Sequence, residues 1–170
     1  MKGAALPLLK IVAILGTLYS LSYYLLCLWG IYTFRRKRSS SRKNFAPPVS
    51  ILKPMRGTDP RAYESLRSHC LQEYPEFEII FGVSSANDPA VPLIERLQRE
   101  FPQRPIRLLV CPEVLGTNLK TSNLIQMLPL ARYDHLLIND SDIRVPQDYL
   151  WQVMERFENP RVGMVTSGAC

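Results

Sequence analysis

Residues 135–145 read HLLINDSDIRV, and this stretch is the most informative feature of the sequence. Apolar residues 136–138, flanked by His135, predict a short buried β-strand, and Asp140 and Asp142 follow it directly. Two carboxylates at the end of a buried strand cost free energy unless something compensates their charge. A divalent cation bound to a diphosphate does so, because Mg²⁺ and Mn²⁺ prefer oxygen ligands and bridge carboxylates to phosphates. The alternative is an ordinary turn, in which Asp and Ser are common.

Strand and helix patterns alternate on both sides of this stretch, which predicts an α/β fold with a parallel sheet. Ligands bind at the carboxyl ends of the strands in such sheets, so the residues after each strand are the candidates for a site. The predicted strands are 49–52, 78–83, 106–110, 135–138 and 162–166. The predicted helices are 59–72, 88–101, 120–128 and 146–157, of which the first two start with Asp-Pro, an N-cap residue followed by proline.

The N-terminal part has a different character, because residues 11–34 contain no charged side chain. As a helix these residues span roughly 36 Å, more than the roughly 30 Å hydrocarbon core of a bilayer. The alternative is a cleaved signal peptide, whose apolar core is shorter. We therefore expect an N-terminal flank (1–10), one transmembrane helix (11–34), a basic and proline-containing linker (35–48) and a globular domain (49–170).

Charge is distributed unevenly along the chain. The net charge is +6, but residues 1–43 hold eight Lys and Arg and no Asp or Glu. The remainder holds 13 basic and 15 acidic residues, which argues against a nucleic-acid-binding domain. The excess of Lys and Arg after the apolar segment predicts a single-pass protein whose soluble domain faces the cytoplasm. The basic strip would also favour anionic lipid headgroups.

Several common sites are missing from the sequence. No G-x-G-x-x-G follows the first strand, no P-loop motif occurs, and the four cysteines show no C-x-x-C spacing. A nucleoside diphosphate held through a metal ion still fits, with Asp140 and Asp142 for the ion and Lys or Arg for the phosphate charge. Lys53 and Arg56 follow the first strand, and Lys120 follows the third.

Four segments taken together resemble the ceramide glucosyltransferase group, glycosyltransferase family 21, and are similar to bacterial hopanoid-associated glycosyltransferases. The resemblance covers roughly residues 48 to 166. The segments are VSILKPMRGTDP from residue 49, FGVSSANDPA from 81, GTNLKTSNL from 116 and YDHLLINDSDIRV from 133.

The resemblance implies an incomplete GT-A-type, Rossmann-like domain that binds a nucleotide sugar. It implies a membrane-anchored, inverting hexosyltransferase that uses Mg²⁺ or Mn²⁺ to move a hexose from a UDP-sugar to the hydroxyl of a lipid, ceramide or hopanoid in type. Asp140 and Asp142 match the metal-binding acids of the family, and Asp142 is the better ligand by analogy. The residues expected to bind the donor are Lys53, Asp88, Lys120, Asn123 and Asp140.

Alternatives stand beside these roles. Asp88 could instead cap the helix that Pro89 starts, and Asn123 could be a helix-surface residue. The family's third acid and its Q/R-x-x-R-W motif do not occur in this sequence. We therefore expect the general base to lie outside this chain, and the catalytic residue is left unknown. The chain could therefore bind nucleotide sugar or a partner without turnover, or serve as a membrane-surface adaptor.

Overall fold

A computed structural model describes residues 5–36 and 45–166. The chain divides into two compact units, Met1–Ser41 and Arg42–Cys170. Each unit is described by itself.

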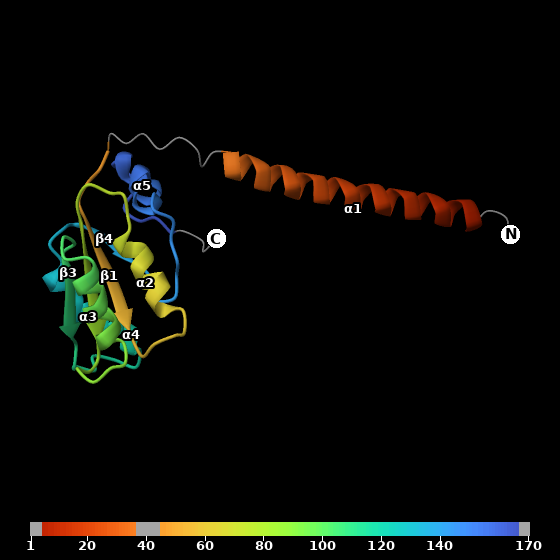
Figure 1. The fold of residues 1–170 in the computed structure, drawn as a ribbon. Coiled ribbons are helices and arrows are strands. Elements are labelled where there is room, and N and C mark those ends of the chain that lie inside the picture. The colour runs from red at the N-terminus through yellow and green to blue at the C-terminus, as the bar shows by residue number, and fades with distance from the viewer. Residues whose placement is uncertain (1–4, 37–44, 167–170) are drawn as a thin grey trace. The chain divides into compact units, whose positions relative to one another are not determined.

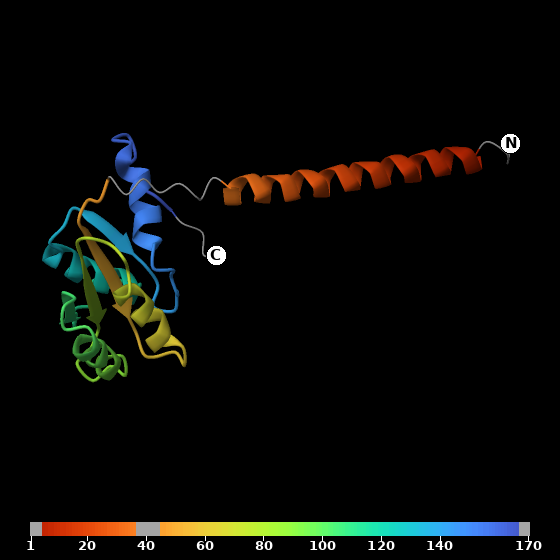
Figure 2. The same ribbon diagram turned by 45° about the horizontal axis from the view of Figure 1, so that its top comes forward.

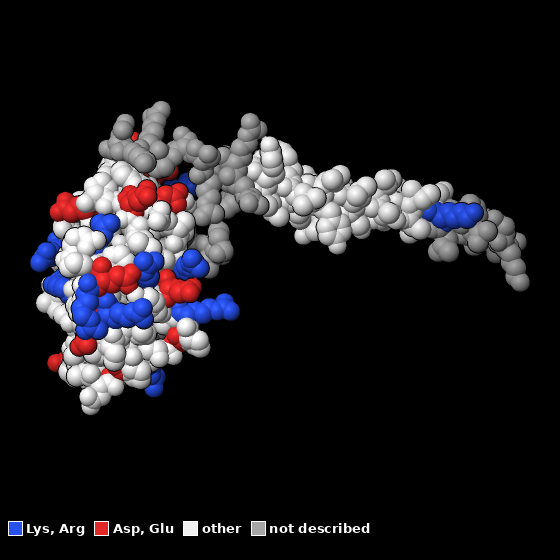
Figure 3. Space-filling view, viewed as in Figure 1, with Lys and Arg blue, Asp and Glu red and all other residues white. Residues whose placement is uncertain are grey.

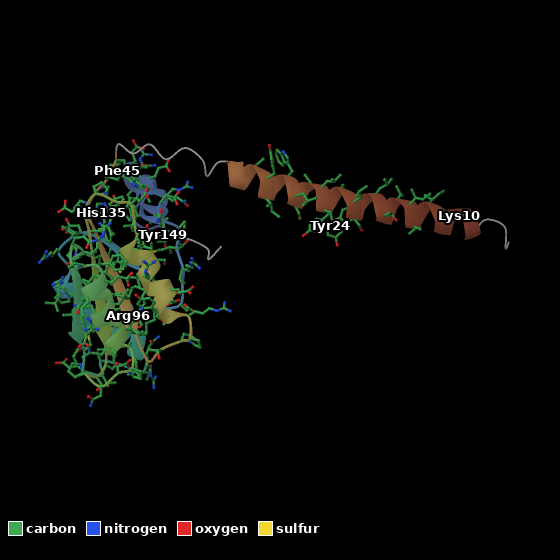
Figure 4. The ribbon with its side chains drawn as sticks, in the orientation of Figure 1. Lys10, Tyr24, Phe45, Arg96, His135 and Tyr149 are labelled. Carbon is green, nitrogen blue, oxygen red and sulfur yellow. The ribbon has the colours of Figure 1, made fainter. Side chains whose placement is uncertain are left out.

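The first unit is one long helix, α1 (Ala5–Arg36) (Figure 1). Within it, Lys10–Thr33 forms a stretch of 24 residues with a mean hydropathy of 1.9, long and apolar enough to cross a membrane. On the face shown in Figure 3, the described part of the helix carries a charged side chain near its N-terminal end, and large residues such as Tyr24 project from it (Figure 4). The predicted basic strip lies outside the described residues except for Arg35 and Arg36.

The second unit is built on a four-stranded parallel sheet in the order β3-β2-β1-β4. The four strands are β1 (Val49–Met55), β2 (Phe77–Val83), β3 (Ile106–Val110) and β4 (His135–Ile138). In the register, Leu52 of β1 lies opposite Ile80 of β2 and Ile138 of β4, so β1 and β4 run side by side (Figure 2). The predicted parallel α/β fold is confirmed.

Both central strands are buried along their whole length, because helices cover both faces of the sheet. Helices α2 (Ala62–Cys70), α3 (Val91–Glu100) and α5 (Tyr149–Met154) pack on one face around the larger core. Helix α4 (Leu119–Met127) packs on the other face, where a smaller cluster joins Leu52, Ile80, Cys111 and Met127. Two short 3₁₀ segments, Leu128–Leu130 and Glu155–Glu158, extend α4 and α5.

Helix α4 approaches β2 closely at Gly82. A Cβ atom at this position would lie 2.3 Å from the sulfur of Met127, which is itself fully buried. Gly82 therefore permits the packing that fixes α4 over the carboxyl end of the sheet. Asn118 caps the helix, because its side-chain oxygen accepts hydrogen bonds from the backbone N–H groups of Lys120 (3.0 Å) and Thr121 (3.3 Å).

Some sequence predictions of local structure are wrong. Residues 162–166 form no strand, because they make no ladder hydrogen bonds with the sheet. The helices predicted to start at Asp59 and Asp88 begin at Ala62 and Val91, and the residue before each offers no side-chain cap. The helix predicted from Pro146 begins at Tyr149 and becomes 3₁₀ after Met154.

Strand β4 was predicted to be buried, and only Leu137 is. Leu136 and Ile138 are 38% and 51% exposed, since β4 lies at the edge of the described sheet and α4 covers only the neighbouring strands on their face.

Candidate functional site

The topology of the sheet creates a crevice at its carboxyl edge. The chain runs from β1 through β2 to β3 and then returns to place β4 on the other side of β1. Loops at the carboxyl ends of β1 and β4 therefore diverge, and such switch points are where open α/β sheets bind ligands. A cleft of about 690 Å³ lies there, lined by Pro54, Met55, Arg56, Asp59, Ser84, Thr117, Asn118, Leu119, Lys120, Asn123, Asp140, Ser141 and Asp142.

The two predicted metal-binding acids both line this cleft. Asp140 and Asp142 are exposed, and the Nζ of Lys120 forms an ion pair with Oδ1 of Asp140. Among the described residues, the carboxylate of Asp142 has no hydrogen-bond or ion-pair partner within the protein. The acid loop (residues 139–142) thus brings one paired and one free carboxylate to the same opening.

These carboxylates fit a cation that is shared with a phosphorylated ligand. No group of three or more His, Cys, Asp or Glu suited to a metal occurs in the described part of the chain. Mg²⁺ needs no such group, because it is usually held by one or two carboxylates together with substrate phosphates. Arg56 and Lys120 line the same cleft and supply positive charge for phosphate oxygens.

Lys53 lies beneath the cleft and does not line it. Its side chain is fully buried, and its Nζ donates a hydrogen bond to the backbone oxygen of Asp140 (2.8 Å). Burial lowers the pKa of Lys53 to about 7, although the charges of Asp140 and Asp142 act in the opposite direction. A direct contact of Lys53 with the donor stays a prediction, and the geometry shows a link to the acid loop instead.

His69 of α2 lies next to Lys53 and is also fully buried. Its Nδ1 lies 3.0 Å from the carbonyl oxygen of Ser65, which can only accept, so Nδ1 carries the hydrogen. Nε2 therefore accepts, from Nζ of Lys53 (3.3 Å) and Nδ2 of Asn139 (3.1 Å). Burial, together with the charge of Lys53, lowers the pKa of His69 to about 3 and keeps the ring neutral. Only the fold reveals that Lys53 and Asn139 are partners of His69, because both are distant from it in sequence.

Asn123 lines the cleft but is not a helix-surface residue, because it is only 3% exposed. Its Oδ1 accepts a hydrogen bond from the hydroxyl of Ser84 (3.2 Å), and its Nδ2 donates to the backbone oxygen of Gly82 (3.4 Å). Asn123 thus ties α4 to the end of β2. Its predicted contact with the donor stays a prediction.

The carboxylate of Asp88 is occupied by backbone N–H groups, one of them in the turn before α3. Its carboxylate accepts hydrogen bonds from the N–H of Ala90 (2.9 Å) and from the N–H of Gly57 (3.1 Å and 3.2 Å to its two oxygens). Gly57 has a φ of 67°, a conformation that favours glycine. Asp88 therefore joins the loops after β1 and β2 and does not line the cleft. Its role at a nucleoside stays a prediction.

Sequence reasoning missed several residues of the cleft and its base. Asp59 was interpreted as a helix cap and lines the cleft, as do Thr117 and Asn118. Ser65 and Asn139 are buried and contact the acid loop or belong to it. Only the position of Asn139 beside the two acids could have indicated its importance, because long-range partners leave no local spacing pattern.

Comparison with solved structures shows which fold this arrangement shares. The mannosyltransferase PcManGT from Pyrobaculum calidifontis, in complex with GDP-Man and Mn²⁺, matches with a TM-score of 0.63 and 24% identity over 91% of this chain and 46% of that chain. S. aureus TarS 1-349 in complex with UDP-GlcNAc matches with a TM-score of 0.53 and 20% identity over 65% of this chain and 31% of that chain. The likeness confirms the GT-A-type fold.

Comparison with curated relatives agrees. Ceramide glucosyltransferase from Komagataella phaffii is 34% identical over 81% of this chain and 28% of its own length. Ceramide glucosyltransferase 3 from Caenorhabditis elegans is 29% identical over 86% of this chain and 32% of its own length, so the chain spans about a third of the length of these relatives. The profile of glycosyl transferase family 21 matches residues 12–169. The resemblance inferred from the four sequence segments is confirmed, and the chain belongs to glycosyl transferase family 21.

Proposed function

We propose that this chain supplies the donor-binding part of a metal-dependent glycosyltransferase, which moves a hexose from a UDP-sugar to the hydroxyl of a lipid. One observation supports this above the others: Asp140 and Asp142 reach the cleft at the switch point of the sheet, beside Lys120. That is the geometry expected where carboxylates, a cation and a diphosphate meet. Among acceptors, the names of the relatives favour ceramide over a hopanoid.

The residues of the cleft have different roles in binding and activating the donor. A bound Mg²⁺ or Mn²⁺ would be held by Asp142 and Asp140 and would supply positive charge for the departing diphosphate. Lys120 and Arg56 bring further positive charge to the phosphate oxygens. The acceptor oxygen attacks the anomeric carbon as the bond from that carbon to the diphosphate breaks, with inversion by family analogy. The hydroxyl proton passes to a carboxylate base that we place in the downstream part of family members.

The domain organisation and the membrane location form part of this proposal. Residues 11–34 would anchor the chain as a single transmembrane helix between a flank (1–10) and a basic linker (35–48), and residues 49–170 would form the transferase part. The length and apolar character of α1 support the anchor. The excess of Lys and Arg in residues 35–43 supports a cytoplasmic orientation of the domain.

Donor binding tests the proposal directly. The full 170-residue chain in detergent is titrated calorimetrically with UDP-glucose, UDP-N-acetylglucosamine and GDP-mannose, with Mn²⁺ or with a chelator. We expect saturable binding of a UDP-sugar that requires the metal. Absence of heat at millimolar ligand, with the chain folded, would contradict the assignment of the cleft.

The second candidate is binding of a nucleotide sugar or a partner without turnover. Incubation of the same chain with a radiolabelled UDP-sugar and ceramide in mixed micelles separates the two candidates. Labelled glycolipid would exclude the second candidate, and donor binding without labelled product would favour it.

A further inference from the structure

The acid loop is held from its buried side by three polar side chains of two elements. Ser65 of α2 donates a hydrogen bond from Oγ to the backbone oxygen of Asp142 (2.9 Å). Lys53 of β1 donates from Nζ to the backbone oxygen of Asp140 (2.8 Å). His69 of α2 accepts from the side chain of Asn139, the first residue of the loop (3.1 Å). Each of the two acids is therefore fixed through its own carbonyl group.

His69 connects these contacts into one network. Because its Nδ1 donates to Ser65, the single acceptor Nε2 faces both Lys53 and Asn139 and fixes the direction in which each donates. The other end of the Asn139 amide is fixed as well, since its Oδ1 accepts from the hydroxyl of Tyr149 (3.4 Å). The network extends from α2 through β1 and the acid loop to α5.

Packing alone does not account for such a network. A buried lysine costs free energy, and apolar side chains of similar volume usually stabilise a core as well or better. Here the polar groups meet the backbone of one four-residue loop, residues 139–142, at its two acids. Outer partners of metal ligands have this kind of arrangement, because they fix the direction in which a ligand points.

We propose that Ser65, His69 and Lys53 are positioning residues that hold Asp140 and Asp142 in the orientation needed to bind a divalent cation together with a diphosphate. This inference rests on the proposed function, because it concerns the same cleft. None of the three residues lines the cleft. Lys53 and Ser65 act through the backbone of the acid loop and His69 acts through the side chain of Asn139, while both exposed carboxylates line the cleft.

The chain contains a matched pair of serines for the test. Ser65 and Ser68 lie on α2, are 3% and 8% exposed, and each bonds a backbone group of the segment after β4. Ser68 reaches Val145, beyond the acids. Mn²⁺ affinity is measured with the full chain in detergent and saturating UDP, from the loss of the free-ion signal in electron paramagnetic resonance. We expect Ser65→Ala to raise the Kd for Mn²⁺ about 10-fold, as for other outer partners, and Ser68→Ala to leave it unchanged.

A second pair examines the network through His69. His69→Gln keeps an acceptor near the position of Nε2, whereas His69→Leu removes it. We expect His69→Gln to retain the Mn²⁺ affinity and the spectrum of the bound ion. We expect His69→Leu and Lys53→Met to weaken the Mn²⁺ affinity and to broaden the spectrum of the bound ion. Melting temperatures are recorded for every variant. If His69→Leu does not fold, the serine pair and Lys53→Met still decide.

The outcomes separate the two proposals. Binding of Mn²⁺ with UDP by the unaltered chain, with a selective loss in Ser65→Ala and Lys53→Met, supports the inference. Equal Mn²⁺ affinities in Ser65→Ala, Ser68→Ala and the unaltered chain overturn the inference and leave the proposed function standing. No Mn²⁺ binding by the folded, unaltered chain overturns both.

Discussion

The loops after β2 and β4 both place aspartate at the carboxyl edge of the sheet, and the two loops differ in what those carboxylates meet. Asp88 is engaged by the N–H groups of Gly57 and Ala90. Asp140 and Asp142 are held through their backbone carbonyls, so their carboxylates reach the cleft. An acid near the end of a strand is thus structural where backbone donors satisfy its side chain, and available for a ligand where they satisfy only its backbone.

The largest expected effect is a difference in Mn²⁺ affinity between substitutions of Asp142 and of Asp88. We expect Asp142→Asn to lower Mn²⁺ affinity in the presence of UDP by more than the roughly 10- to 100-fold that loss of an outer partner costs, because a ligand itself is removed. Asp88→Asn should change this affinity little. Asp134→Asn, an exposed acid at the other end of β4, serves as the control. A similar loss in Asp88→Asn and Asp142→Asn would remove the distinction between the loops.

The next largest effect concerns the loss of folding stability at low pH, which we expect to arise in the network beneath the acid loop. The pKa of His69 is about 3 in the folded chain and 6.5 as its ordinary value, so only the unfolded state binds this proton in between. Its contribution to stability is complete above about pH 6.5 and is lost as the pH falls toward 3, on the order of 1.4 kcal/mol per pH unit. Urea unfolding of the full chain in detergent, followed by tryptophan fluorescence from pH 7 to 4, should show a shallower slope for His69→Gln. Equal slopes would contradict this assignment.

Asp88→Ala should lower stability rather than metal affinity. Its carboxylate satisfies two backbone N–H groups, so we expect the free energy of unfolding to fall by about 1–2 kcal/mol. Asn87→Ala, an exposed neighbour, is the control, and urea unfolding at pH 7 is the measurement. A loss of UDP affinity at unchanged stability would instead indicate contact with the nucleoside.

The smallest effect on stability should come from Lys120→Met. The ion pair between Lys120 and Asp140 has both side chains about half exposed (49% and 57%). Such pairs contribute about 0–1 kcal/mol to stability because solvent screens them. Affinity for UDP should nevertheless fall, most at low salt, and Lys120→Arg should restore part of it. A large drop in melting temperature would show that the pair is structural.

Local patterns predicted much of this molecule because they depend on neighbours in sequence. The strands 106–110 and 135–138 have the predicted bounds, and the cleft lies at the predicted edge of the sheet. Residues 162–166 have strand-like composition but form no strand, since a strand exists only through hydrogen bonds to another strand. The buried Glu78 shows the same limit: it is held by Arg107, which lies 29 residues away in sequence.

The sequence by itself determined the order of apolar runs, and with it the parallel sheet, the long apolar helix and the placement of the Asp140 and Asp142 pair after a strand. The tertiary structure alone decided which polar side chains face the cleft. Lys53 lies on the same face of β1 as Ile51 and Met55, because every second residue of a strand points to the same side, so it points toward α2 and supports the acid loop from below. Asp88 is occupied because the N–H of Gly57 reaches it from another loop. Such partners are distant in sequence, and only folding brings them within hydrogen-bonding distance.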